Sequence, residues 1–377
     1  MLGKTNIIYV AKDQGSEMQF VTQTIVTRSS SDIKGIKYLN GLFFVFTAAD
    51  TVLYGEDMGN LEFLKSGDGL LAASNAEYYD GKYFFINSTE EYGTETVAYY
   101  VSRDLSAFEQ HEISYGDAVQ GVIAKVLDIV INSSGQLTFF LCRTHTYKNG
   151  TSTVTDATFY ICIYDDAKES NFEIRISNSQ QIWESEQKHM FMRDRFLFYS
   201  SESRYNNKEE SCYCITMDAT VEQTDKKYYP IGIAADMAYI SIGSNTYYSL
   251  NFKNYIKARS TPVTSCFLVG GRIGLYNENT VELASKVTDF ASGNSTTLDV
   301  AGMDYQVLCH VVSGEYTYLG CEGGIIVQCL LDAEGTYQTP EITLIKTLSA
   351  KQALSQAQKY TDKKIEELRA YIDGQSG

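Results

Sequence analysis

Seven short hairpin patterns recur along the chain, at intervals that are mostly about forty to sixty residues. In the clearest copies, 38–46 and 78–86, an apolar run stops at Asn-Gly or Asp-Gly and then resumes. These pairs favour a primed two-residue turn, because both central residues need positive φ and the turn then matches the twist of the flanking strands. The weaker copies are 131–140, 191–196, 242–247, 268–273 and 312–318. Repeated β-hairpins at this spacing predict an all-β protein, a seven-bladed β-propeller.

The predicted propeller covers residues 1–347. Twenty-nine tyrosines and eighteen phenylalanines against three prolines suit a chain of many strands. Two segments leave the blade count open: 231–260 holds barely three strands, and 7–26 resembles the last two strands of a blade whose first half is missing. A ring of six or eight blades therefore stays an alternative.

A second pattern places an aspartate just after a further apolar run, where the third strand of a blade turns into the fourth. A carboxylate there can accept hydrogen bonds from the amides of its own turn. The pattern resembles a degenerate Asp-box of sialidase-like propellers, in which Ser-x-Asp-x-Gly precedes an aromatic residue. Ser102-Arg103-Asp104 keeps the serine and Asp13-Gln14-Gly15 keeps the glycine. We expect structural turns at Asp13, Asp57, Asp104, Asp166, Asp218 and Asp332.

Composition argues against several classes of protein. The formal net charge of −16, from 31 basic and 47 acidic residues, would repel nucleic acid, and no basic stripe offsets it. No apolar segment is long enough to insert into a membrane, and the start of the chain shows no signal peptide. The eight cysteines lie mostly within apolar runs, so we expect small buried thiols and no metal site. No cofactor motif is visible.

The last thirty residues change character. Residues 348–371 contain no glycine or proline and are rich in Ala, Gln, Lys, Glu and Leu, which predicts one α-helix within 348–377. Its narrow apolar stripe suits a seam against other helices, for attachment or homo-oligomerisation. A helix lying on the rim of its own propeller is the alternative. The stripe includes Leu354, Ala357, Ile365, Leu368 and Ile372.

The segment Ala353–Ile365 reads Ala-Leu-Ser-Gln-Ala-Gln-Lys-Tyr-Thr-Asp-Lys-Lys-Ile. It resembles the Ala-Leu-x-x-Ala-x-x-Tyr-Thr-Asp-x-Lys-Ile segment of tail-fibre, baseplate and head-fibre proteins of phages of Gram-positive bacteria. In that family such helices join a globular module to the particle or trimerise it. The resemblance implies a virion component, made in the bacterial cytoplasm, with other virion proteins as partners of the helix.

Three long connections are predicted between the second and third strands of consecutive blades, at 87–96, 143–156 and 200–210. Such connections share one face of a propeller, and exposed tyrosine, asparagine and arginine are frequent contact residues in binding interfaces. The alternative is a set of surface insertions without a ligand. The predicted ligand contacts are Tyr92, His145, Tyr147, Arg204 and Tyr205.

These observations favour a non-enzymatic subunit of a phage tail or baseplate, which presents its propeller to a host-surface glycan or protein. A head-fibre or other decorating subunit without a receptor role is one alternative. A sialidase-like glycosidase is another, although the sequence shows neither a convergent carboxylate pair nor the arginine set that such a site needs.

Overall fold

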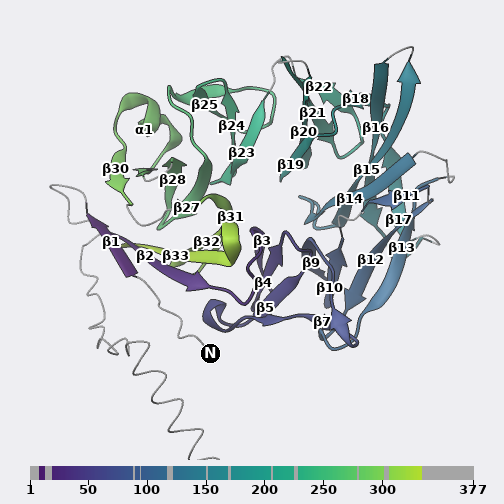
Figure 1. Cartoon of the computed structure of the whole chain (residues 1–377), viewed down its shortest axis with the longest axis horizontal. Helices are drawn as coiled ribbons and strands as arrows, with labels where there is room; N and C mark the ends of the chain where they lie inside the picture. Colours follow the sequence, from purple (N-terminus) through teal and green to yellow (C-terminus); the bar gives the residue numbers. More distant parts are fainter. Residues whose placement is uncertain are drawn as a thin grey trace, which may run out of the picture. The chain divides into compact units, whose positions relative to one another are not determined.

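The structure is a computed structural model, and it forms a β-propeller. It describes residues 8–12, 19–87, 90–93, 95–116, 122–149, 152–168, 171–204, 207–224, 228–277, 280–300 and 305–332. All of these belong to one compact unit, Met1–Gly335. They form seven sheets of four to six strands, here called blades, and one two-stranded sheet. The prediction of an all-β, seven-bladed propeller is therefore confirmed (Figure 1).

Blades 1 to 3 come first in the chain. Blade 1 contains β3 (Ile33–Leu39), β4 (Leu42–Thr47), β5 (Val52–Gly55) and β6 (Glu62–Phe63), with the short turn η1 (Met58–Asn60). The ribbon of β7 (Lys65–Ser66) and β8 (Gly69–Leu70) follows. Blade 2 contains β9 (Asn75–Tyr79), β10 (Lys82–Ile86), β12 (Thr96–Ser102) and β13 (Glu109–Ser114). Blade 3 contains β14 (Val122–Ile131), β15 (Leu137–Asn149), β16 (Ser152–Tyr164) and β17 (Phe172–Ile176), joined by β11 (Glu91–Tyr92) and β18 (Gln180–Ile182).

Blades 4 to 7 complete the ring. Blade 4 contains β19 (Glu186–Met192), β20 (Arg195–Arg204), β21 (Asn207–Thr216) and β22 (Val221–Gln223). Blade 5 contains β23 (Tyr229–Ala234), β24 (Met237–Ile242), β25 (Asn245–Ser249) and β26 (Ile256–Arg259). Blade 6 contains β27 (Ser265–Val269), β28 (Arg272–Asn277), β29 (Thr280–Ala284), helix α1 (Val287–Ser292) and β30 (Thr296–Asp299). Blade 7 contains β31 (Val307–Ser313), β32 (Tyr316–Cys321), η2 (Glu322–Gly324), β33 (Ile325–Asp332), β2 (Gln19–Val26) and β1 (Ile8–Lys12).

The first strands of the blades lie around the centre of the ring. β3 contacts β9, β9 contacts β14, and β19, β23, β27 and β31 contact one another in succession. β31 also contacts β3, so the last blade meets the first (Figure 1). Within each blade the strands are antiparallel, so second-to-third connections and links between blades share one face, here the hairpin face. First-to-second and third-to-fourth turns share the opposite face, here the turn face.

The turns of the first hairpins explain both the success and the failure of the repeat pattern. Asn40-Gly41 has φ of 48° and 85°, and Asp80-Gly81 has φ of 46° and 74°, as a primed turn requires. In blade 5 the same turn is Ala235-Asp236, with φ of 51° and 54°. It contains no glycine, so the pattern missed it. The copy assigned to 242–247 is instead the second hairpin of that blade, β24–β25.

The N-terminal strand closes the ring. β2 pairs with β33 from Gln19 opposite Asp332 to Val26 opposite Ile325, and β1 pairs with the outer edge of β2. β2 and β1 are therefore the fourth and fifth strands of blade 7, where the sequence of 7–26 suggested a third and a fourth strand. Because these strands complete an existing blade and add none of their own, the count is seven, and the alternatives of six and eight are wrong.

The hydrophobic core consists of seven clusters, one between each pair of adjacent blades. Between blades 3 and 4, the rings of Phe140 and Phe196 stack with centroids 4.1 Å apart, and both side chains are fully buried. Between blades 6 and 7, Phe20 of β2 packs near Phe267 of β27. The blades are therefore held face to face mainly by aromatic and aliphatic burial.

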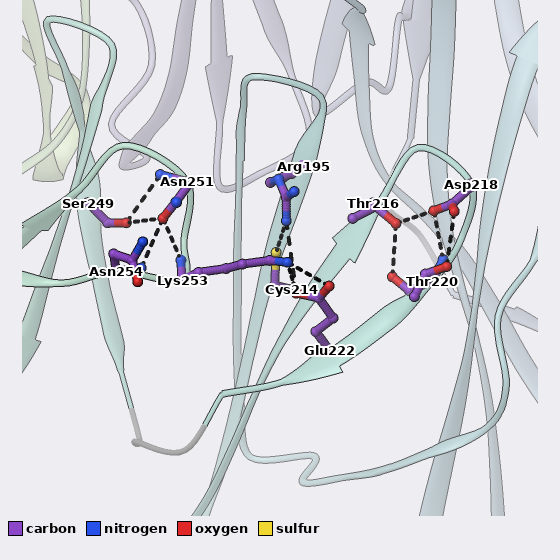
Figure 2. Close-up of polar contacts among 10 residues, drawn as sticks. All are labelled: Arg195, Cys214, Thr216, Asp218, Thr220, Glu222, Ser249, Asn251, Lys253 and Asn254. Carbon is purple, nitrogen blue, oxygen red and sulfur yellow. Dashed lines mark hydrogen bonds and ion pairs between the residues drawn. The ribbon is translucent and has the colours of Figure 1, made fainter.

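Polar side chains fix the third-to-fourth turns on the turn face. Asp57 accepts from the amide of Gly59 at 3.0 Å, and Asp104 accepts from the amide of Ser106 at 2.9 Å. Asp218 accepts from the amide of Thr220 at 3.2 Å (Figure 2). Each bond satisfies an amide of the turn itself, which is the arrangement expected from the sequence.

Two of the expected aspartates lie differently. In blade 3 the amide of Ala167 is bonded by Asp165, and not by Asp166. Asp332 lies in the β33 ladder opposite Gln19, and not in a turn, because β2 continues the sheet there. Asp13 lies outside the described residues.

In blade 5 this turn is fixed by Asn251, which was not predicted from the sequence. Its side-chain oxygen accepts from the amides of Lys253 and Asn254, both at 2.9 Å (Figure 2). An amide oxygen serves this turn as well as a carboxylate does.

Three further expectations concern the C-terminal region, the membrane and metal binding. The predicted C-terminal helix, with Leu354, Ala357, Ile365, Leu368 and Ile372, lies outside the described residues and stays a prediction. Among the described residues, no helix has the length and apolar character to cross a membrane. In that part of the chain no three His, Cys, Asp or Glu side chains gather as metal ligands would.

Candidate ligand-binding face

Two long β-hairpins stand on the hairpin face. β15 and β16 stay paired up to Asn149 opposite Ser152, and β20 and β21 stay paired up to Arg204 opposite Asn207. The sequence suggested exposed loops at these places. Threonine recurs at every second position on both sides of the Asn-Gly pair at 149–150. This pattern favours two paired strands joined by a tight turn, and it could have predicted the hairpin.

The third predicted connection, 87–96, reaches the neighbouring blade. Its strand β11 pairs with β14, with Glu91 opposite Ala124 and Tyr92 opposite Ile123. Blade 2 therefore supplies the strand next to the innermost strand of blade 3. Glu90 and Tyr92 follow β10 of blade 2 in the chain, but they line the gap between blades 3 and 4.

A cleft of about 440 Å³ opens in this gap on the hairpin face. Even-numbered residues of β15 point toward blade 4, since Phe140 and Cys142 belong to the core shared with that blade. The cleft lies above that core. It is lined by Glu90, Tyr92, Ile123, Lys125, Cys142, Thr144, Glu184 and Gln187.

The polar groups of the cleft are only partly satisfied by one another. Tyr92 donates its hydroxyl to Glu90 at 3.0 Å, and this bond raises the pKa of the phenol. The ammonium of Lys125 lies 3.7 Å from Glu90 Oε1. Glu184 Oε1 accepts from the hydroxyls of Thr146 and Thr155, at 2.8 and 2.7 Å.

Gln187 is the exception in the cleft. Its Oε1 atom is buried and has no hydrogen-bond partner among the described residues. A buried acceptor without a donor costs free energy of about 1–3 kcal/mol.

A second hollow, of about 260 Å³, lies on the opposite side of the β15–β16 hairpin and is lined by Val122, Arg143, His145, Asp156, Thr158 and Ser179. The rings of His145 and Tyr147 have centroids 5.5 Å apart. Tyr147 donates to Asp156 Oδ2 at 2.9 Å, which raises the pKa of the tyrosine.

A charged cluster lies between blades 4 and 5 on the same face. Lys208 Nζ lies 3.2 Å from Glu210 Oε1 and 3.7 Å from Glu186 Oε2, so one ammonium is shared by two carboxylates. Tyr199 donates to Glu210 at 2.7 Å, and Tyr229 donates to Glu186 at 3.1 Å. Burial is the main cause that raises the pKa of Tyr229 to about 12. This cluster could not be predicted from the sequence, because its members come from four separate strands.

The central strands carry a further polar network. Asp128 accepts from Asn75 Nδ2 at 2.6 Å, and its other oxygen lies 3.9 Å from His189 Nε2. Burial lowers the pKa of His189, and the nearby Asp128 opposes that shift. Lys37 pairs with Glu77 across blades 1 and 2. These side chains bind one another across blades 1 to 4.

The predicted contact residues divide into two groups. Tyr92 lines the larger cleft, whereas His145 and Tyr147 meet on the other side of the same hairpin. Arg204 ends β20 at the tip of the second hairpin. Tyr205 lies outside the described residues. The structure therefore brings His145 and Tyr147 together and keeps Tyr92 apart from them.

Comparison with known proteins shows the fold. No protein-family model and no curated protein matches the chain. The structure is similar to a catalytically inactive virginiamycin B lyase from Staphylococcus aureus with quinupristin, with a TM-score of 0.53 and 12% identity over 83% of this chain and 100% of that one. It is also similar to YCF48 bound to D1 peptide, with a TM-score of 0.52 and 9% identity over 82% of this chain and 97% of that one. Neither name points to a phage particle or a sialidase, and at such low identity the likeness establishes a seven-bladed β-propeller.

Proposed function

We propose that this chain is a non-enzymatic binding subunit of a phage tail or baseplate. Its hairpin face binds a host-surface glycan or protein. The observation that carries the binding role is the cleft of about 440 Å³ at the base of the β15–β16 hairpin, where the side chains of Glu90, Tyr92, Lys125 and Glu184 converge. A concave site with a few convergent polar groups is the usual form of a ligand site.

The virion part of the proposal rests on the sequence of Ala353–Ile365 and its resemblance to phage tail-fibre, baseplate and head-fibre segments. Under this proposal the C-terminal helix binds other virion proteins or further copies of the chain, and the propeller is the exposed module. A head-fibre or decorating subunit would share the helix but would have no ligand on the hairpin face.

The arrangement of the carboxylates supports a non-catalytic role. Glycoside hydrolysis needs two carboxyl groups on either side of a substrate. On the hairpin face, the ammonium of Lys208 interacts with both Glu186 and Glu210, and each carboxylate also accepts from a tyrosine hydroxyl. These groups are occupied by one another, which leaves them poorly placed to transfer protons to a sugar.

The test shortens the hairpin without changing its register. Deletion of 146–148 together with 153–155 removes three cross-strand pairs and brings the turn onto the pair of His145 and Asp156. The full chain is incubated with a panel of Gram-positive cells, and bound protein is measured by fluorescence. We expect binding to at least one strain that falls about tenfold or more in the shortened variant.

The control removes an exposed aromatic side chain at the turn face. Tyr38 is 45% exposed and precedes the first hairpin turn, so Tyr38→Ala should leave cell binding unchanged. Equal binding by the shortened variant would refute a role of the hairpin face. Release of reducing sugar from cell walls that Glu186→Gln abolishes would refute the non-enzymatic role.

A further inference from the structure

We propose that the cleft between blades 3 and 4 binds an uncharged sugar residue. The inference deepens the proposed binding function and rests on it. It names the chemical class of ligand for one site, defined by Lys125, Glu184, Gln187, Tyr92 and Glu90.

The cleft presents both hydrogen-bond donors and acceptors. Gln187 is among its lining residues, although its Oε1 atom is itself buried. Glu184 accepts two threonine hydroxyls at Oε1, and in the described part of the chain no lysine or arginine forms an ion pair with it. Lys125 lies 3.7 Å from Glu90 and keeps only 18% of its side chain exposed. A hydroxyl group both donates and accepts, so closely spaced hydroxyls match this lining.

The charges of the cleft disfavour an anionic ligand. Its lining holds two carboxylates, Glu90 and Glu184, against one ammonium, that of Lys125, which lies 3.7 Å from Glu90. The site is partly enclosed, so these charges are weakly screened. An uncharged ligand avoids the repulsion and still hydrogen-bonds to Lys125 and Glu184, and a cation is the alternative that the spermidine probe tests.

Size and surface chemistry agree with this class. A volume of about 440 Å³ lies within the usual range for small-molecule sites. The ring of Tyr92 is 67% exposed beside the cleft, and its hydroxyl is held by Glu90. A fixed aromatic face offers a surface on which the apolar C–H face of a sugar ring can pack at low entropic cost.

The experiment measures binding of defined probes to the full chain. The uncharged probes are the methyl glycosides of glucose, galactose, mannose and N-acetylglucosamine. The charged probes are N-acetylneuraminic acid and spermidine. Saturation-transfer NMR detects binding, and calorimetry gives Kd. We expect at least one uncharged glycoside to bind, and neither charged probe to bind as tightly.

Variants then locate the site. Gln187→Ala and Tyr92→Ala should each raise the Kd of that glycoside about tenfold or more. Tyr38→Ala is the matched control, because Tyr38 is also an exposed tyrosine, and it lies next to the first hairpin turn on the turn face, away from the cleft. Its Kd should equal that of the wild type. Circular dichroism and urea unfolding establish that each variant folds.

Three results would overturn the sugar assignment: no uncharged glycoside binds, a charged probe binds more tightly, or the cleft variants bind as the wild type does. If cells still bind through the hairpin while glycosides do not, the sugar assignment fails and the proposed binding function stands. If the shortened hairpin leaves cell binding unchanged, the proposed function fails by itself.

Discussion

Replacement of Phe20 by alanine tests whether the N-terminal strand closes the ring. Phe20 lies in β2, is fully buried, and packs in the core between blades 6 and 7, where its ring centroid is 6.5 Å from that of Phe267. Truncation of a buried phenylalanine costs about 3–5 kcal/mol, from lost burial and the cavity that remains. We expect Phe20→Ala to lower the free energy of unfolding by about 4 kcal/mol.

The assay is urea unfolding followed by tyrosine and tryptophan fluorescence. A shift of the midpoint at constant slope gives the change in stability. Tyr147→Ala serves as control, because its side chain is exposed and should change the free energy of unfolding by no more than about 0.5 kcal/mol. In a double-mutant cycle, Phe20→Ala and Phe267→Ala should couple, since the two rings share one core.

The reasoning would be refuted if Phe20→Ala cost less than about 1 kcal/mol, the size of an ordinary substitution. It would also be refuted if a chain without residues 1–26 unfolded at the same urea concentration as the intact chain. Either result would mean that β33 does not need β2 as its outer neighbour.

Three further predictions concern the turns and the thiols. Gly324→Ala should lower the free energy of unfolding in urea by about 3 kcal/mol or more, because the new Cβ would lie 1.8 Å from the carbonyl oxygen of Ser29. Gly314 has open space around it, so Gly314→Ala should lower that free energy by only about 1–2 kcal/mol, through left-handed backbone strain. Hydrogen bonds from the Thr216 hydroxyl, the larger cause, and from the Thr220 amide hold the pKa of Asp218 below its ordinary value of 3.8. The difference in thermal stability between the wild type and Asp218→Asn should therefore be full at neutral pH. It should vanish as the pH falls below the pKa of Asp218 in the folded protein. A difference that grows on acidification would contradict that sign. All eight cysteines are free thiols, and burial raises the pKa of Cys142 and of Cys212 to about 12. Ellman's reagent at pH 8 should therefore modify the cysteines rapidly only after the protein is unfolded in urea.

The ring of hairpins could be predicted because its signals are local. Asn40-Gly41 and Asp80-Gly81 encode their own positive φ, and the apolar runs beside them encode their own strands. Ala235-Asp236 adopts the same conformation without glycine, because the flanking strands β23 and β24 impose it. Local propensity is weak there, and pairing decides the outcome.

The candidate site could be predicted only in part, for a related reason. Tyr92 was found as an exposed residue in a long connection, but its position beside Lys125 depends on β11 crossing to another blade. The cluster around Lys208 depends on strands far apart in the chain that meet at the hairpin face. The spacing of residues in the sequence does not predict these contacts. The alternation of side chains along a strand shows which residues share a face of that strand, but not which other strand lies beside it.

The pairing of β33 has a mechanical consequence for any attachment through the C-terminal segment. β33 lies between β32 and β2, with ladders of hydrogen bonds along both edges. A pull applied beyond Asp332 and directed along the strand therefore loads both ladders in shear, and many bonds must break together. A tethered propeller built this way would resist being torn from its support, because the strand that carries the force is locked in place by the first strands of the same chain.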